Sequence, residues 1–149
     1  MENLLKFIKS QRLLSIATIN SDGPWIANVY YVCDDQYKFY FLSSKDTKHS
    51  KSILNNPEVA VSITWFDQKN HRNRKSIQGT GVCRLANLSE IKTGVGLLYQ
   101  NFPDLRDILT LKWVSENIWN SRIWVVDLKY VKYWDDEIYG DSESEEFRF

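Results

Sequence analysis

Hydrophobic and polar residues alternate with a period of two along several stretches of the 149-residue chain. The clearest case is residues 58–65, where Val59, Val61, Ile63 and Trp65 fall on one face and smaller residues fall on the other. Successive side chains of a β-strand point to opposite faces, so this alternation predicts a strand with one buried side. Similar patterns, rich in β-branched and aromatic residues, predict further strands at residues 13–19, 25–33, 37–43, 74–85 and 122–134.

Other segments show the spacing of an amphipathic helix. They lie at residues 4–8, at residues 87–100 and, as a shorter helical piece, at residues 104–111. Another short helix is expected after the third strand, with Ser44 or Asp46 as its cap. This helix should end before Pro57, because proline disfavours a helical conformation in the residue ahead of it.

Six or so strands, an early helix and a helical insertion before the last strand predict a mainly β fold. The expected architecture is an antiparallel, Greek-key-like barrel, closed or nearly closed, which leaves few exposed sheet edges. Gly79 and Gly81 within the fifth strand suggest a bulge or a close backbone approach. Residues 1–134 are expected to form this one domain, and residues 135–149 are expected to be a solvated acidic tail.

The formal net charge of zero hides an uneven distribution. Seven of the 19 acidic residues and only one of the 19 basic residues follow Trp134, so the preceding part is basic. Its basic residues concentrate at residues 45–51 and 69–75, which makes phosphate or nucleic acid the candidate partners. No secretory signal or membrane-spanning apolar run is present, so a cytoplasmic location and no membrane partner are expected.

The chain lacks the sequence motifs of catalysis by protein groups alone. No Ser-His-Asp grouping, P-loop or HExxH motif occurs, and two histidines are too few for a histidine-built metal site. Cys33 and Cys83 match no metal or redox spacing and are expected to be free buried thiols. Chemistry on an organic cofactor needs fewer side chains, because the cofactor carries the reaction.

The segment that leaves the third strand and enters the short helix has the composition of a phosphate site. Ser43, Ser44 and Thr47 offer hydroxyl donors, Lys48 offers a positive charge, and a helix amino end favours an anion. The same residues would also suit an ordinary capped helix with a solvated lysine. Spacing alone leaves both interpretations open.

The run IATINSDGPWIANVYYVCDDQYKFYFLSSKDTKHSKSILNNPEVAVSI, residues 16–63, resembles the first half of a pyridoxamine 5′-phosphate oxidase-like domain. The shared order is an alternating strand, a DG turn, a strand, an aromatic strand ending in Ser or Thr, a basic turn and a helix ending in NNP. The closing half, with IWVVDLKYVKYWDD, more weakly resembles a small uncharacterised bacterial branch of that superfamily. This resemblance implies a split barrel that binds FMN at the interface of a homodimer.

The resemblance also implies which residues hold FMN. The residues that match the family positions lie on the second strand, at the end of the third strand and at the start of the following helix. They are Asn28, Val29, Tyr30, Leu42, Ser43, Lys48 and His49, with Lys48 and His49 in the place of a basic pair that binds the phosphate. Thr47, a hydroxyl donor of the same segment, is the further cofactor-binding candidate.

Two departures from the family pattern limit this assignment. The oxidase proper has an arginine where this chain has Asn28, so one phosphate contact is missing and Lys51 is the candidate substitute. A family glutamine aligns best near Ser76, but Gln78 lies two residues further on the same strand face and is the candidate here. The basic carboxy-terminal segment that grips the substrate phosphate in the oxidase is replaced by acidic residues, so vitamin B6 oxidase activity is not expected.

The function that the resemblance implies is an FMN-dependent oxidoreductase that passes electrons between a nicotinamide cofactor and a small planar substrate. The alternative is a non-enzymatic protein that binds a flavin, haem or another tetrapyrrole, and a deazaflavin would use the same phosphate site. Single-stranded nucleic acid is a third class of partner, but Tyr31, Phe39 and Phe41 alternate as if they face a core and would not stack on bases.

Overall fold

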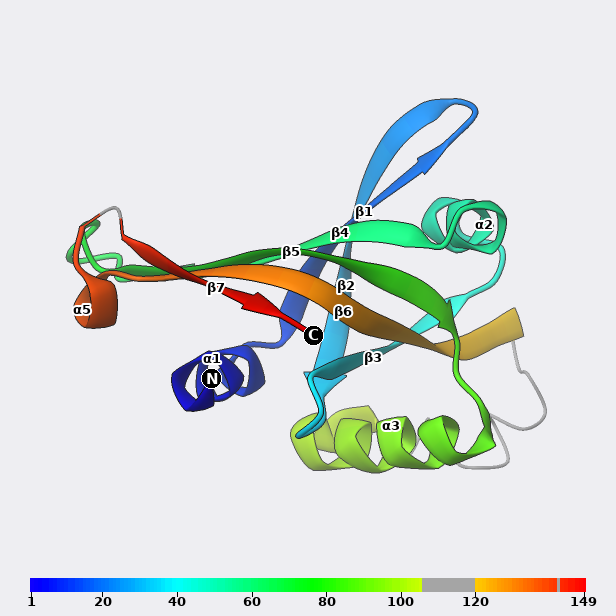
Figure 1. Cartoon of the computed structure of the whole chain (residues 1–149). Helices are drawn as coiled ribbons and strands as arrows, with labels where there is room; N and C mark the ends of the chain where they lie inside the picture. Colours follow the sequence, from blue (N-terminus) through cyan, green and yellow to red (C-terminus); the bar gives the residue numbers. More distant parts are fainter. Residues whose placement is uncertain (106–119, 142) are drawn as a thin grey trace.

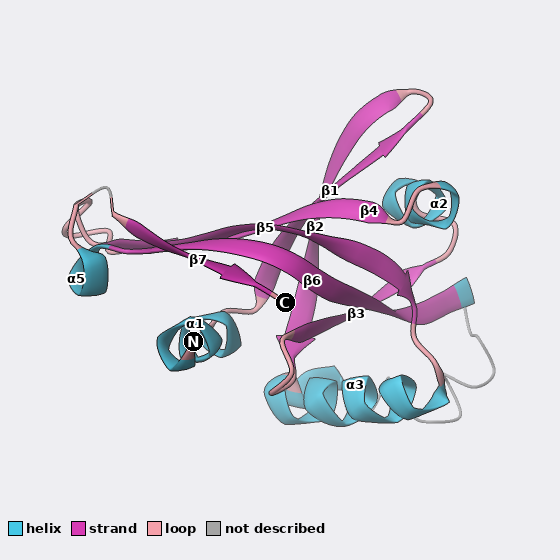
Figure 2. Cartoon of the chain, in the orientation of Figure 1, coloured by secondary structure: helices cyan, strands magenta, loops and turns pink. Residues whose placement is uncertain are grey.

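The computed structural model describes residues 1–105, 120–141 and 143–149, and its strands form one antiparallel sheet (Figures 1 and 2). The strand order is β3-β2-β1-β4-β5-β6-β7, and an additional pairing of β3 with β6 closes the first six strands into a barrel. The predicted mainly β fold with a split-barrel architecture is therefore confirmed. The elements are α1 (Glu2–Ser10), β1 (Leu13–Asn20), β2 (Gly23–Cys33), β3 (Lys38–Ser44), α2 (Lys48–Asn55), β4 (Glu58–Phe66), β5 (Arg74–Leu85), α3 (Leu88–Asn101), η1 (Pro103–Leu105), β6 (Ser121–Asp135), α5 (Asp136–Tyr139) and β7 (Ser144–Arg148).

The predicted helices also occur, with two differences. The cap of α2 is Thr47 rather than Ser44 or Asp46, because β3 continues through Ser44, which pairs with Ser121. The helical piece expected at residues 104–111 is seen as the short η1, and the remainder of that prediction lies outside the described residues. None of the helices in the described ranges combines the length and apolar content needed to cross a membrane.

The barrel interior is filled by alternate side chains of the strands. Tyr31, Phe39 and Phe41 are fully buried there, as their spacing predicts, and Trp124 of β6 is fully buried beside them. Cys33 and Cys83 are free and buried, and burial raises the pKa of both thiols. A second apolar cluster lies between the barrel and α3, which covers one side of the strands (Figure 1).

The interpretation of residues 135–149 as a solvated tail is wrong. Asp136–Tyr139 form α5 and Ser144–Arg148 form β7, and β7 pairs with residues 130–134 of β6 as the seventh strand of the sheet. Phe147 is 8% exposed and belongs to the main core, while Glu145 and Glu146 lie on the surface. The segment folds onto the barrel because one aromatic side chain is buried, although most of its residues are charged.

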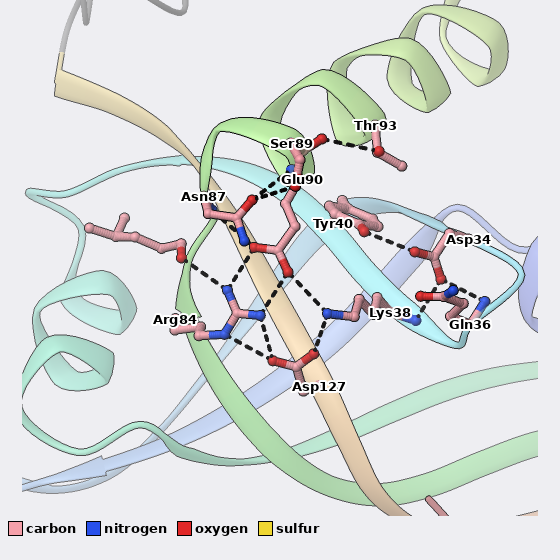
Figure 3. A network of polar contacts seen from close by, with 11 residues as sticks. Asp34, Gln36, Lys38, Tyr40, Arg84, Asn87, Ser89, Glu90, Thr93 and Asp127 are labelled. Atoms are coloured by element: carbon pink, nitrogen blue, oxygen red, sulfur yellow. Dashed lines mark hydrogen bonds and ion pairs between the residues drawn. The ribbon is translucent and has the colours of Figure 1, made fainter.

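A network of charges fastens α3 to the barrel (Figure 3). Two nitrogens of Arg84 lie 2.7 Å from the two carboxylate oxygens of Glu90, and Lys38 Nζ lies 3.0 Å from the same carboxylate. Asp127 on β6 accepts from Arg84 at 3.0 Å and pairs with Lys38 at 3.1 Å. Glu90 also completes the capping box of α3 with Asn87. The Arg84 guanidinium and the other donors hold the pKa of Glu90 well below its usual range.

We expect Glu90→Gln to lower the free energy of unfolding by about 1.5–3 kcal/mol at neutral pH, the usual contribution of hydrogen bonds to a charged group. The folded-state pKa of Glu90 is depressed, so its contribution is present above the unfolded pKa, about 4.3, and is lost as the pH falls below that value. The difference in stability between wild type and Glu90→Gln should therefore shrink in acid. Urea unfolding at several pH values measures it, and a difference that is constant or grows toward low pH would contradict this account.

Candidate functional site

The junction between β3 and α2 brings together most of the residues predicted to bind phosphate. The hydroxyl oxygen of Thr47 accepts the backbone N–H of Ser50 at 3.3 Å and so caps α2. The N–H groups of Lys48 and His49 precede the first hydrogen bond of the helix, which runs from Lys51 N–H to the Thr47 carbonyl at 3.0 Å. These two N–H groups are the ones left for an anion at this helix end.

Lys48 is an exposed cation at the start of α2. Its Nζ lies 4.3 Å from the centre of the Trp25 ring, and no carboxylate among the described residues forms an ion pair with it. Trp25 belongs to the β1–β2 hairpin, which projects from the barrel next to α2 (Figure 1) and is tied to it by a 2.8 Å hydrogen bond from Asn20 to Ser52. Lys51 lies one turn further along the helix and is also exposed.

His49 occupies a different environment from its neighbour. The side chain turns inward, is 9% exposed and lies with Nε2 2.8 Å from the hydroxyl of Ser43. Burial lowers the pKa of His49, so the ring is mainly neutral near pH 7. Of the two basic residues expected at the start of the helix, only Lys48 therefore presents a positive charge, because desolvation disfavours the charged form of the other.

The residues expected on β2 and β3 divide between the two faces of the barrel wall. Asn28 and Tyr30 point outward and are exposed, whereas Val29 is 8% exposed and packs in the core. Leu42 packs against the second apolar cluster. The side chains of Val29 and Leu42 are therefore packed within the protein, while those of Asn28 and Tyr30 are available to a ligand.

Gln78 shares the outer face of the sheet with Asn28. Strand register places Asn28 opposite Ser15, Ser15 opposite Ser62, and Ser62 opposite Gln78, which makes a polar row across β2, β1, β4 and β5. The hydroxyl of Ser15 donates to Asn28 Oδ1 at 2.7 Å. Strands in a sheet lie about 4.8 Å apart, so roughly 14 Å separates the two ends of this row.

Ser15 and Ser62 are members of the polar row that the sequence reasoning missed. The alternation in their strands places both outside the barrel, but their alignment with Asn28 and Gln78 depends on pairing between residues far apart in sequence. The candidate residues therefore form two groups, one at the β3–α2 junction and one on the outer face. None of the hydrogen bonds among the described residues joins these two groups directly.

The closed barrel, the helix after its third strand and the helical insertion before its sixth define a split-barrel protein. Residues 1–101 match the family model of pyridoxamine 5′-phosphate oxidase, which covers more than half of the chain. The chain belongs to this family, as the resemblance indicated.

Known proteins similar to the chain include a UPF0306 protein of Campylobacter jejuni, which is 28% identical over 103 residues, or 68% of this chain and 72% of the relative. A haem-binding protein of Mycobacterium smegmatis superimposes with a TM-score of 0.75 at 13% identity, over 97% of this chain and 56% of that structure. A FAD-binding protein of Mesorhizobium loti superimposes with a TM-score of 0.64 at 15% identity, over 87% and 88%. At these identities the two structures establish the fold alone.

Proposed function

We propose that the protein is an FMN-binding oxidoreductase whose phosphate site is the β3–α2 junction. The observation that carries this proposal is that Ser43, Thr47 and Lys48 lie together at the amino end of α2, and that Lys48 has no ion-pair partner among the described residues. A phosphate group carries the charge and the acceptor oxygens that suit this arrangement. Bound FMN would supply the redox chemistry, and the protein groups would bind and orient it.

The proposed site is completed by a second copy of the chain. The outer face of the sheet carries large apolar side chains that are exposed to solvent in the monomer. Leu13 is 51% exposed, Ile26 is 64% exposed and Tyr30 is 67% exposed. They flank the polar row from Asn28 to Gln78. A two-fold dimer that pairs these faces would bury the apolar side chains and enclose a planar ligand against the polar groups. A small-molecule substrate would then meet the flavin between the subunits.

We expect the chain to sediment as a homodimer, and Ile26→Glu to shift it toward monomer because a charge would be buried in the paired face. Leu88→Glu is the matched control, since Leu88 is 88% exposed at the first position of α3 and does not lie on the strands β2, β1, β4 and β5 that carry the polar row. Sedimentation velocity at micromolar concentration measures both variants. A monomer that retains full flavin occupancy would contradict the proposed interface.

Lys48→Ala should weaken FMN binding by roughly 10- to 150-fold, the equivalent of losing a hydrogen bond to a charged group, about 1.5–3 kcal/mol. Riboflavin lacks the phosphate, so its affinity should be nearly the same for wild type and variant. Fluorescence titration with both ligands measures the two effects separately. Lys92→Ala, an exposed lysine on α3, serves as the control for a general loss of positive charge. Equal FMN affinity in wild type and Lys48→Ala would remove the junction as the phosphate site.

The alternative is a protein that binds a flavin, a deazaflavin or haem without catalysing a reaction. The absorption spectrum of freshly purified protein distinguishes these ligands. If the spectrum is that of a flavin, anaerobic mixing with NADH or NADPH tests for the oxidoreductase, because bound flavin loses its yellow absorption on reduction. A haem spectrum would instead favour the binder, and its iron ligand would have to be sought beyond the buried His49, whose Nε2 already contacts Ser43.

A further inference from the structure

A buried hydrogen-bonded pair lies directly behind the proposed phosphate site. His49 Nε2 lies 2.8 Å from Ser43 Oγ, and the histidine side chain is 9% exposed. Its other ring nitrogen, Nδ1, makes no hydrogen bond with any of the described residues. The contact with Ser43 is therefore the shortest polar contact that fixes this ring.

The surroundings hold both members of the pair in place. The carbonyl of Ser43 accepts a hydrogen bond of 3.1 Å from the indole nitrogen of Trp124, which is fully buried. The ring of Phe41 stacks on Trp124 and lies 6.3 Å from the His49 ring, centre to centre. With the backbone and the imidazole fixed, the main freedom left at Ser43 is the direction of its hydroxyl hydrogen.

Neighbouring hydroxyls do not determine that direction. Thr47 Oγ1 lies 3.4 Å from Ser43 Oγ and 3.2 Å from His49 Nε2, but it is closer to Ser50 Oγ, at 2.8 Å, and to the carbonyl of Ser44, at 3.1 Å. The hydrogen of Thr47 therefore has closer acceptors than Ser43. His49 Nε2, at 2.8 Å, is the nearest polar partner of the Ser43 hydroxyl.

The position of one proton on His49 then decides what Ser43 can offer a ligand. A neutral imidazole carries its hydrogen on Nδ1 or on Nε2. If Nε2 is bare, Ser43 donates its only hydrogen to His49 and presents lone pairs toward the junction, which repel phosphate oxygens. If Nε2 carries the hydrogen, His49 donates to Ser43 Oγ, and the hydroxyl hydrogen of Ser43 is free to point at a phosphate.

We propose that His49 is a positioning residue that aims the Ser43 hydroxyl at a bound phosphate group by holding its proton on Nε2. This inference rests on the proposed phosphate site. It gives His49 a role other than the one that the resemblance implied, which was to bind the phosphate as a cation beside Lys48. Binding of a phosphate group shifts the imidazole toward the Nε2–H tautomer. His49 itself does not contact the ligand through its side chain.

Affinity measurements on a double-mutant cycle test the coupling. Ser43→Ala should weaken FMN binding roughly 10- to 150-fold, as expected for loss of a hydrogen bond to a charged group. His49→Leu should weaken it on the order of 10-fold in the wild-type background and hardly at all in Ser43→Ala, because both changes remove one interaction. His49→Gln, whose amide can donate to Ser43, should restore most of the affinity. Riboflavin binding should be unchanged throughout, which a general structural defect would not allow.

Nitrogen NMR of the histidine rings reads the tautomer directly. The chain contains only His49 and His71, and His71 is exposed in the β4–β5 loop, so His71→Gln assigns the two sets of signals. Saturation with FMN, or with inorganic phosphate as a simpler probe, should move His49 Nε2 to a protonated-type shift and Nδ1 to an unprotonated-type shift. Ser43→Ala should abolish that response, while His71 should not respond.

The outcomes separate this inference from the proposed function. If FMN binds and His49 keeps a bare Nε2, or if the double-mutant cycle is additive, the positioning role is overturned and the FMN site stands. If FMN does not bind but phosphate produces the Ser43-dependent shift, the FMN proposal falls and the positioning role stands. If neither ligand changes the His49 signals, the positioning role is overturned as well.

Discussion

Deletion of residues 144–149 is expected to lower the free energy of unfolding by about 3–5 kcal/mol, the range for removing a buried aromatic side chain. The deletion removes Phe147 from the core and the pairing of β7 with residues 130–134 of β6. It also removes the hydrogen bond from Phe149 N–H to the Lys129 carbonyl and the ring contact between Phe149 and Tyr37 at 4.9 Å. For a domain of this size the melting temperature should fall by roughly 6–20 °C.

Point variants separate the contribution of the core residue from that of the charged strand. Phe147→Ala should reproduce most of the loss, because Phe147 is the buried residue of β7. Glu146→Ala changes an exposed residue on the same strand and should stay within about 0.5 kcal/mol of wild type. Thermal unfolding followed by circular dichroism measures all three proteins. If the truncated chain has the same melting temperature as wild type, the carboxy-terminal strand contributes nothing to stability.

The missed strand shows where sequence reasoning works in this fold and where it does not. Strands such as β4 place three or more apolar residues on one face, so their period-two pattern is visible without the rest of the chain. The segment SEEFR contains one buried aromatic between charged residues, and that pattern has no period. The segment becomes a strand because β3 pairs with β6 only as far as Asp127, which leaves the same edge of β6 open at residues 130–134. That open edge exists only once the barrel has assembled.

The sequence also predicted the backbone of the candidate site but not the direction of all its side chains. The order of residues around Ser43 and Lys48 indicated a strand that leads into a helix, and the structure has that arrangement. The period-two geometry of β2 explains why Val29 faces away from Asn28 and Tyr30, although the resemblance grouped the three residues together. The inward turn of His49 could not be predicted, because it depends on the space left by Phe41 and on the Ser43 hydroxyl beneath it.

The glycines of β5, which suggested a bulge or a close backbone approach, lie where β5 passes very near β6. The register with β6 shifts between Thr80 and Gly81, so that Thr80 pairs with Tyr130 and Gly81 pairs with Leu128. At Gly81 a Cβ atom would lie 2.5 Å from the backbone carbonyl oxygen of Asp127, a separation that Cβ atoms essentially never show. A side chain there must displace the backbone of β6, since the obstructing atom is not the end of a flexible side chain.

We expect Gly81→Ala to lower the free energy of unfolding by about 3 kcal/mol, at the upper end for overpacking, because the strain reaches the network that fastens α3. Asp127 supplies both the obstructing carbonyl and the carboxylate that binds Arg84 and Lys38. Gly96→Ala is the matched control: a Cβ at Gly96 meets nothing within 4 Å, and alanine in a helix interior is favoured over glycine by about 0.5–1 kcal/mol. The two identical substitutions should therefore change stability in opposite directions in urea unfolding. Equal stability of Gly81→Ala and wild type would show that β6 can move away from β5 at little cost, and the close approach would then have no part in fixing the register.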